Sequence, residues 1–167
     1  MLLGSSRLDE ATFNHYLALK DELYRADIED LTADGLLPGV LEFIRSAYQR
    51  DLKMGVASSS RSAELILTKT GIHVYMDAIG DGGTVSRSKP APDIFIWVAG
   101  ALRVRPAAAI VIEDSQAGID AALTAGMFVV GIGKHAVVGD IPVRAASLQQ
   151  LDLDRLIEQF KAARDRR

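Results

Sequence analysis

The sequence contains no cysteine, which excludes a disulfide framework and a thiolate zinc site. Its histidines, His15, His73 and His135, are too scattered to form a metal cluster, so any bound metal needs oxygen ligands. There is no basic excess: 19 Lys and Arg against 22 Asp and Glu argue against nucleic acid as a partner. No apolar run approaches the roughly 20 residues of a membrane span, and the first residues lack the features of a signal peptide. We therefore expect a cytoplasmic protein with no membrane partner.

What is present is typical of a globular domain. Of the 167 residues, 49% are hydrophobic and 25% are charged. Apolar residues recur at helical spacing over residues 9–28, and a second amphipathic helix is expected over residues 40–48. Pro38-Gly39 is the strongest internal helix breaker. We place a domain boundary near Leu36, which divides the chain into residues 1–36 and 37–167.

Beyond this boundary, apolar runs alternate with helical patterns. Strands are expected at residues 52–57, 78–79, 108–112 and 127–131, and helices at residues 61–70, 92–102, 116–125 and 152–163. Strands that are apolar throughout and alternate with helices are typical of a parallel sheet covered on both faces. The predicted fold class is therefore α/β, a doubly wound parallel sheet. Ligands bind such sheets beyond the carboxyl ends of the strands, so polar residues there are the candidate site.

Three groups of polar residues follow predicted strands. Ser58-Ser59-Ser60-Arg61 offers hydroxyls and backbone amides to an anion, although serines there also suit helix capping. Lys89 lies in a loop stiffened by two prolines and suits either a phosphate contact or a solvated position. Glu113 and Asp114 end a buried strand, where paired carboxylates suit Mg²⁺; Asp114 alone also suits helix capping. Together the three groups predict one crevice for a phosphate and a magnesium ion.

Two segments carry a resemblance to a known family. Ser88-Lys89-Pro90-Ala91-Pro92-Asp93-Ile94-Phe95 and Glu113-Asp114-Ser115-Gln116-Ala117-Gly118-Ile119 resemble motifs of the haloacid dehalogenase (HAD) superfamily, in its β-phosphoglucomutase-like branch. The resemblance extends over nearly the whole chain. It implies a HAD-like Rossmannoid core at residues 37–167 and, at residues 1–36, a remnant of a helical cap domain, its C-terminal part.

The resemblance also implies roles for individual residues. Ser58 corresponds to the hydroxyl that holds the transferring phosphoryl group, with help from the Ser59 amide. Lys89 corresponds to the lysine that neutralises the same phosphate. Glu113 and Asp114 correspond to the acids that hold Mg²⁺, the implied cofactor.

Three further residues stand where the branch contacts the rest of its substrate. Ser60 and Arg61 correspond to contacts with the other phosphate, and Arg61 replaces the lysine of close relatives, which keeps the charge but changes its geometry. Lys20 corresponds to a cap lysine that faces the active site. Its place within an apolar helical stripe also suits a lysine that extends its charge to solvent.

The sequence departs from the family at one motif. Members begin with an apolar strand ending in Asp-x-Asp-Gly, which supplies the nucleophile and the general acid, and this sequence contains no such motif. In the family that strand lies between the strands that here end at Ser58 and Asp114. A core lacking its first strand leaves two sheet edges unpaired, so we expect the chain to be poorly stable, to self-associate through those edges, or to fill the gap with another segment.

The implied function is phosphoryl transfer on a small sugar phosphate. The branch interconverts β-glucose 1-phosphate and glucose 6-phosphate through an aspartyl-phosphate with Mg²⁺. A sugar-phosphate phosphatase of the same superfamily is the alternative, because the same core supports hydrolysis. A remnant that binds phosphate and Mg²⁺ without turnover is a third reading, favoured by the absent nucleophile motif.

Overall fold

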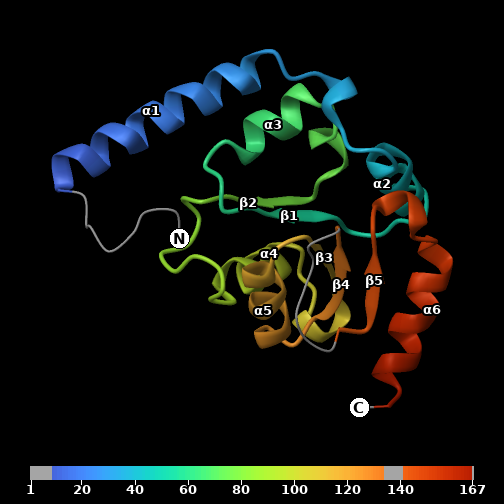
Figure 1. Cartoon of the computed structure of the whole chain (residues 1–167). Coiled ribbons are helices and arrows are strands. Elements are labelled where there is room, and N and C mark those ends of the chain that lie inside the picture. The colour runs from blue at the N-terminus through green and yellow to red at the C-terminus, as the bar shows by residue number, and fades with distance from the viewer. Residues whose placement is uncertain (1–8, 134–140, 167) are drawn as a thin grey trace.

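A computed structural model describes residues 9–133 and 141–166 (Figure 1). The helices are α1 (Glu10–Glu29), α2 (Val40–Tyr48), α3 (Ala63–Lys69), α4 (Asp93–Ala101), α5 (Gln116–Thr124) and α6 (Leu153–Arg164). The strands are β1 (Gly55–Ala57), β2 (Ala78–Gly80), β3 (Ile110–Glu113), β4 (Phe128–Ile132) and β5 (Val143–Ala145). Short 3₁₀ helices lie at Ala33–Gly35, His73–Tyr75, Pro106–Ala108 and Leu148–Gln150. Within these ranges no helix is long and apolar enough to cross a membrane.

The first predicted helix is confirmed as α1, and Asp9 caps it. Asp9 Oδ1 accepts a hydrogen bond from the Thr12 backbone N–H at 2.8 Å, and Oδ2 accepts one from the Thr12 hydroxyl at 2.8 Å. These bonds favour the charged carboxylate and so lower the pKa of Asp9. The helix therefore begins where the helical spacing of the sequence predicts.

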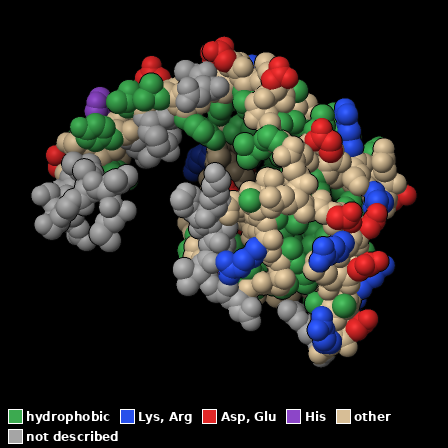
Figure 2. Space-filling view, turned by 45° about the vertical axis from the view of Figure 1, so that its right-hand side comes forward, with side chains coloured by type: hydrophobic (Ala, Val, Ile, Leu, Met, Phe, Trp, Pro, Cys, Tyr) green, Lys and Arg blue, Asp and Glu red, His purple; other side chains and the backbone are tan. Residues whose placement is uncertain are grey.

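The C-terminal end of α1 packs against the core. Ile28 is 3% exposed, and Lys69 Nζ of α3 donates to the Glu29 carbonyl at 2.9 Å. Earlier in the helix, five large apolar side chains are exposed: Phe13, Tyr16, Leu19, Leu23 and Tyr24. The helix extends away from the sheets, and apolar side chains lie along the surface of this arm (Figures 1 and 2). The apolar stripe of α1 is thus largely uncovered by described residues.

All strand pairs in the described residues are parallel, which confirms the α/β class. β1 is shorter than predicted, because the Met54 N–H donates to Asp77 Oδ2 at 2.8 Å instead of joining a strand ladder. β5 was not predicted. Its three residues, with Arg144 at the centre, form no apolar run that marks a strand in the sequence.

The described strands form two sheets rather than one. β1 pairs with β2, and β3, β4 and β5 form a second sheet in that order. Figure 1 shows β1 and β2 running across the view while β3, β4 and β5 run up it. Neither β1 nor β3 has a described strand on its second edge. These are the two edges that the sequence predicts to be unpaired.

The hydrogen-bond pattern shows which backbone groups face these edges. The Met54 carbonyl accepts from the Asp77 N–H, just before β2, and the Ser58 N–H donates to the Gly80 carbonyl of β2. By the alternation of a parallel ladder, the backbone groups of Gly55 and Ala57 therefore face away from β2. The Ala109 carbonyl accepts from Phe128 of β4. By the same alternation, the N–H and C=O groups of residues 110 and 112 face away from β4.

Helix α4 connects the two sheets through side-chain packing. Its Val98 belongs to a cluster with Ala78 of β2, and its Phe95 belongs to a cluster with Val111 of β3. Ala57 of β1 packs against both clusters. On the other side of the second sheet, α6 packs a separate cluster that includes Leu156 and Phe128. The core therefore lies in layers, with α4 as the link between sheets.

The unpaired edges predict an alternating pattern of amide hydrogen exchange. The amides of Ala57 and Ile112 are expected to exchange much faster than their neighbours Val56 and Val111, because only the neighbours bond within a ladder. Residue-resolved exchange measured by NMR on the monomer tests this. Uniformly high protection across both strands in a proven monomer would contradict the open edges.

Candidate functional site

The loop between β1 and α3 contains the predicted phosphate-binding residues. The Ser58 N–H donates to the Gly80 carbonyl at 2.9 Å. The Ser58 hydroxyl accepts from the Ser60 N–H at 3.1 Å, and the Ser60 hydroxyl accepts from the Ser62 N–H at 3.1 Å. These bonds stabilise local turns before α3 and do not cap it, because the N-cap of α3 is Ser62, which makes no side-chain capping hydrogen bond. Each hydroxyl keeps its own hydrogen, which it can still donate to an anion.

A second loop, after β2, holds the first in place. The Gly82 N–H donates to the Ser60 carbonyl at 3.2 Å. Gly82 also lies so close to Ser59 that a Cβ on it would overlap the Ser59 carbonyl oxygen. Sequence reasoning missed this residue. The run Asp81-Gly82-Gly83 signals a turn, but no local pattern reveals which other loop the turn touches.

Asp81 organises that second loop and lies near Arg61. Its Oδ1 accepts from the Gly83 N–H at 2.8 Å and from the Thr84 hydroxyl at 2.9 Å. The bond from Gly83, then the bond from Thr84 and, more weakly, the charge of Arg61 lower the pKa of Asp81. The exposed Arg61 therefore has a charged carboxylate in its surroundings, which the sequence did not indicate.

Lys89 and Glu113 lie in direct contact. The Lys89 ammonium pairs with Glu113 Oε1, and the two side chains are only 11% and 9% exposed. Lys89 Nζ also lies 4.7 Å from the centroid of the Phe95 ring of α4. The alternative of a solvated loop lysine is therefore wrong. The structure confirms that Lys89 is near the acidic pair, as expected from the carboxyl ends of parallel strands.

The second oxygen of Glu113 is occupied as well. Glu113 Oε2 accepts from the Asp114 N–H at 3.2 Å, the Ser115 N–H at 3.3 Å and the Ser115 hydroxyl at 3.0 Å. Ser115 is also the N-cap of α5, because its hydroxyl accepts from the Gly118 N–H at 3.1 Å. The capping role considered for Asp114 thus belongs to Ser115, and Asp114 is exposed.

The predicted magnesium site is not complete in these residues. Carboxylate oxygens are the right donors for Mg²⁺. Among the residues that the structure describes, however, no three histidines or acids gather where they can hold a metal ion. Each oxygen of Glu113 already has a partner, Lys89 at Oε1 and the Ser115 hydroxyl at Oε2, while Asp114 is exposed. The metal-binding role of the pair stays a prediction.

The remaining predicted residues have different outcomes. Ser58, Ser60 and Arg61 lie at the carboxyl end of β1, and Ser59 is held by the loop after β2. Lys20 lies in α1, but its side chain is outside the described part, so its role stays a prediction. His135 falls between the described ranges.

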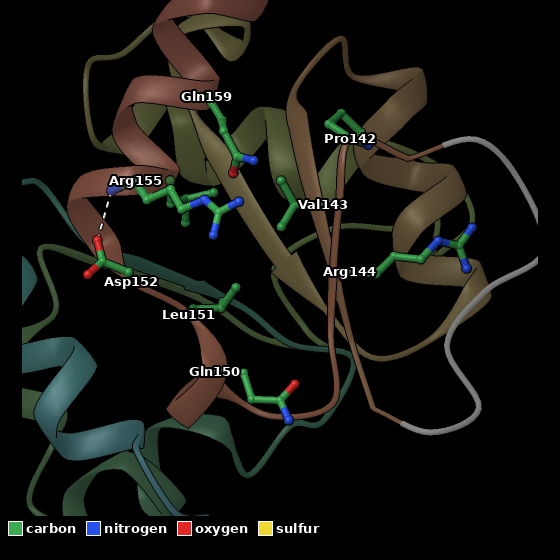
Figure 3. A pocket seen from close by; sticks show the side chains of 9 residues that line it. Pro142, Val143, Arg144, Gln150, Leu151, Asp152, Arg155 and Gln159 are labelled. Carbon is green, nitrogen blue, oxygen red and sulfur yellow. Dashed lines mark hydrogen bonds between the residues drawn. The ribbon is translucent and has the colours of Figure 1, made fainter.

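One cavity lies away from these residues. It has a volume of about 310 Å³ and is lined by Pro142, by Val143 and Arg144 of β5, by residues 150–152 and by the first turns of α6. Arg155 and Gln159 point toward Val143 in Figure 3. None of the predicted site residues lines this cavity, so it is separate from the candidate site.

Comparison with known proteins finds a matching family model and several similar proteins. Residues 9–132 match the model of the haloacid dehalogenase-like hydrolases. A β-phosphoglucomutase of Bacillus subtilis is 40% identical over 149 residues, 88% of this chain and 65% of that protein. A fructose-1-phosphate phosphatase of Escherichia coli is 38% identical over 84 residues, 50% of this chain and 45% of that protein. The crystal structure of a β-phosphoglucomutase from Clostridium difficile matches with a TM-score of 0.81 at 33% identity, over 86% of this chain and 65% of that one.

The chain therefore spans less than two-thirds of the length of each of these relatives. The similarity covers most of this sequence but leaves at least a third of each relative without a counterpart in it. What the relatives' names say of activity and substrate belongs to those longer proteins.

The close approach of Gly82 predicts a position-specific loss of stability. Gly82→Ala is expected to destabilise the fold by about 1–3 kcal/mol, because a backbone atom of Ser59 must move. Gly83→Ala is the matched control, since its Cβ meets only Asp81 Oδ1 at 3.4 Å. Urea unfolding of both variants measures the difference. Equal midpoints for the two would contradict the contact.

The lowered pKa of Asp81 predicts a pH-dependent effect of Asp81→Asn. A carboxylate whose pKa falls on folding stabilises the protein above its unfolded value of 3.8, and this contribution is lost as the pH falls through the folded pKa. The variant is therefore expected to be less stable than the parent at pH 7, with the difference shrinking below about pH 4. Urea titrations at several pH values test this. A pH-independent difference would show that the charge is not the cause.

Proposed function

Because this chain belongs to the haloacid dehalogenase-like hydrolase family, whose model matches most of it, we propose that it acts on a small sugar phosphate. The proposed activity is phosphoryl transfer, the interconversion of β-glucose 1-phosphate and glucose 6-phosphate. The extent of the similarity to the Bacillus β-phosphoglucomutase carries this proposal. In this proposal, the residues of this chain form the phosphate-binding part of the active site.

The phosphate-binding part combines hydroxyls and one ammonium group. Ser58 would donate its hydroxyl hydrogen to a phosphate oxygen, and the Ser59 amide would add a second donor. Lys89 would supply the positive charge, in a loop that the packing of Phe95 helps to hold. Charge-assisted hydrogen bonds of this kind are roughly twice as strong as neutral ones.

The other end of the substrate would meet a different set of residues. Arg61 and Ser60 would contact a second phosphate, with Lys20 approaching from α1. The planar guanidinium group of Arg61 can donate hydrogen bonds to two phosphate oxygens at once. The Asp81 carboxylate lies near Arg61 and would restrict the orientation of that guanidinium group.

The chemistry needs a group that this sequence does not contain. The family forms an aspartyl-phosphate on the first aspartate of Asp-x-Asp-Gly, and that motif is absent from the printed residues. Without it, neither the nucleophile nor the general acid is available, and the acid alone contributes about 10²- to 10⁴-fold. We therefore expect the chain by itself to bind sugar phosphates without turning them over.

A sugar-phosphate phosphatase is the second candidate. The similarity to the Escherichia coli fructose-1-phosphate phosphatase favours it. The two activities differ in whether the acceptor is a sugar hydroxyl or water, which depends on how well water is excluded from the site. Mg²⁺ is the predicted cofactor for both, because the acidic pair offers hard oxygen donors.

Phosphorus NMR tests the binding proposal on the chain itself. The signal of β-glucose 1-phosphate is expected to broaden or shift when the chain is added, while neither glucose 6-phosphate nor inorganic phosphate accumulates. Lys89→Met should abolish the shift by removing the ammonium group, whereas Lys161→Met, on the exposed surface of α6, should preserve it. An unchanged signal with the parent chain would overturn the proposal.

The activity itself is tested on a longer polypeptide. The DNA upstream of the Met1 codon is sequenced and translated in frame. If it encodes an apolar strand ending in Asp-x-Asp-Gly, the longer polypeptide that includes this segment is expressed and assayed. Formation of glucose 6-phosphate would support the mutase, and release of inorganic phosphate without an isomerised sugar would support the phosphatase. A stop codon or an unrelated sequence there would favour the binding role without turnover.

A further inference from the structure

We infer that Arg87 and Asp93 position Lys89: their ion pair closes the loop of residues 88–92, which contains that lysine, and so fixes where its ammonium group lies. The inference rests on the proposed function, since Lys89 is the residue that is proposed to bind phosphate. The family resemblance gives no role to either partner of the pair. Three observations carry the inference: the contact across the ends of the loop, the burial of the Asp93 carboxylate, and the anchoring of α4 in the core.

The loop is closed at both ends. Arg87 Nε donates to Asp93 Oδ1 at 2.8 Å, which joins the residue before the loop to the residue after it. Inside the loop, the Ala91 N–H donates to the Ser88 carbonyl at 3.0 Å. Lys89 and the proline after it are therefore the central residues of a turn. The ion pair encloses this turn.

Within the described part of the chain, Arg87 is the only hydrogen-bond donor to the Asp93 carboxylate. The Asp93 side chain is 21% exposed, whereas that of Arg87 is 72% exposed. The second carboxylate oxygen, Oδ2, is buried and accepts no hydrogen bond from the described residues. A carboxylate that loses its one donor in such a place gains by moving out to water. Loss of the arginine would therefore favour an open loop.

The core fixes one side of the ion pair. Asp93 is the first residue of α4, where the helix dipole favours a negative charge, and Phe95 of the same turn is 6% exposed. Arg87 thus binds a group that α4 holds in place. From the loop between them, the Lys89 ammonium reaches the Phe95 ring at 4.7 Å and pairs with Glu113. The place of the ammonium group therefore depends on a closed loop.

The two partners carry opposite charges, so the direction of an effect tests the inference. If the loop stayed closed without the pair, an anion would respond to charge alone. Removing the charge of Arg87 would then weaken phosphate binding, and removing the charge of Asp93 would strengthen it. If the pair positions Lys89, both changes weaken binding.

Titration with β-glucose 1-phosphate, followed by phosphorus NMR, measures these effects. Arg87→Met and Asp93→Asn are each expected to weaken binding by about twofold to fivefold, since an ion pair with one exposed partner is weak. The double variant should bind no more weakly than the weaker single variant, because the second change removes a partner that is already lost. Arg87→Lys keeps the charge and should recover part of the affinity.

A second readout does not depend on phosphate. Acylation of lysines by an N-hydroxysuccinimide ester, followed by mass spectrometry, reports whether the Lys89 amine is held. Lys89 should react several-fold faster in Arg87→Met and in Asp93→Asn than in the parent chain.

Two other lysines are internal controls in every sample. The exposed Lys161 reports the activity of the reagent. Lys53 Nζ donates to the carbonyl of Leu102, at the other end of α4, at 2.8 Å, so it reports a general opening of the structure. Both are expected to keep their parent rates while Lys89 reacts faster.

A second arginine–aspartate pair provides matched control variants. Arg50 Nε donates to Asp154 Oδ1 at 2.9 Å and Nη2 donates to Oδ2 at 2.7 Å, which joins the end of α2 to the first turn of α6. Arg50→Met and Asp154→Asn make the same changes of charge and size outside the loop. They should leave both the labelling of Lys89 and the affinity for the sugar phosphate as in the parent chain.

The outcomes distinguish the inference from the proposed function. Parent-like labelling of Lys89 in both loop variants would overturn the inference, as would equal acceleration of Lys53 and Lys89. Affinity shifts of opposite sign in Arg87→Met and Asp93→Asn would also overturn it. Faster labelling of Lys89 alone, with no sugar-phosphate binding by the parent chain, would refute the proposed function, while the hold of the ion pair on the loop would stand.

Discussion

The packing of α4 between the two sheets is the interaction on which the rest of the described structure depends. β1 and β3 share no described ladder, so side chains rather than backbone hydrogen bonds connect their sheets. Phe95 packs with Val111 and Val98 with Ala78, each buried to 9% exposure or less. Burying such a side chain contributes roughly 1.5–3 kcal/mol, but the contact is non-directional. Apolar packing therefore joins the two sheets without fixing the register between their strands, as a ladder of backbone hydrogen bonds would.

The same helix sets up the candidate site. Phe95 contributes to the core and also faces the Lys89 ammonium, so the lysine is supported by a residue that stability requires. Glu113 ends β3 and meets Lys89 from the other side. Lys89 and its carboxylate partner thus lie where α4 and the second sheet come together. A change that shifted α4 would alter both the core and the surroundings of Lys89.

Local patterns predicted much of the fold. The stripe of α1, the apolar α4 and the strands β3 and β4 follow from periodicity and composition within single segments. β5 was missed because a three-residue strand with a central arginine has no such pattern. The start of β1 was misplaced because the Asp77 carboxylate, distant in sequence, captures the Met54 N–H. The errors arise where a contact from elsewhere in the chain replaces a local preference.

The sequence by itself determined the family, the α/β class and the residue types at the strand ends, because motifs and periodicity are local properties of the chain. Only the tertiary structure decided what those residues touch. Lys89 and Glu113 are 24 positions apart, and nothing in either motif shows that their charges neutralise each other. Gly82 and Gly118 are likewise ordinary turn and helix glycines until the Ser59 carbonyl and the Glu113 carboxylate occupy the space beside them. Such partnerships depend on which strands and helices become neighbours, and that is settled when the core packs.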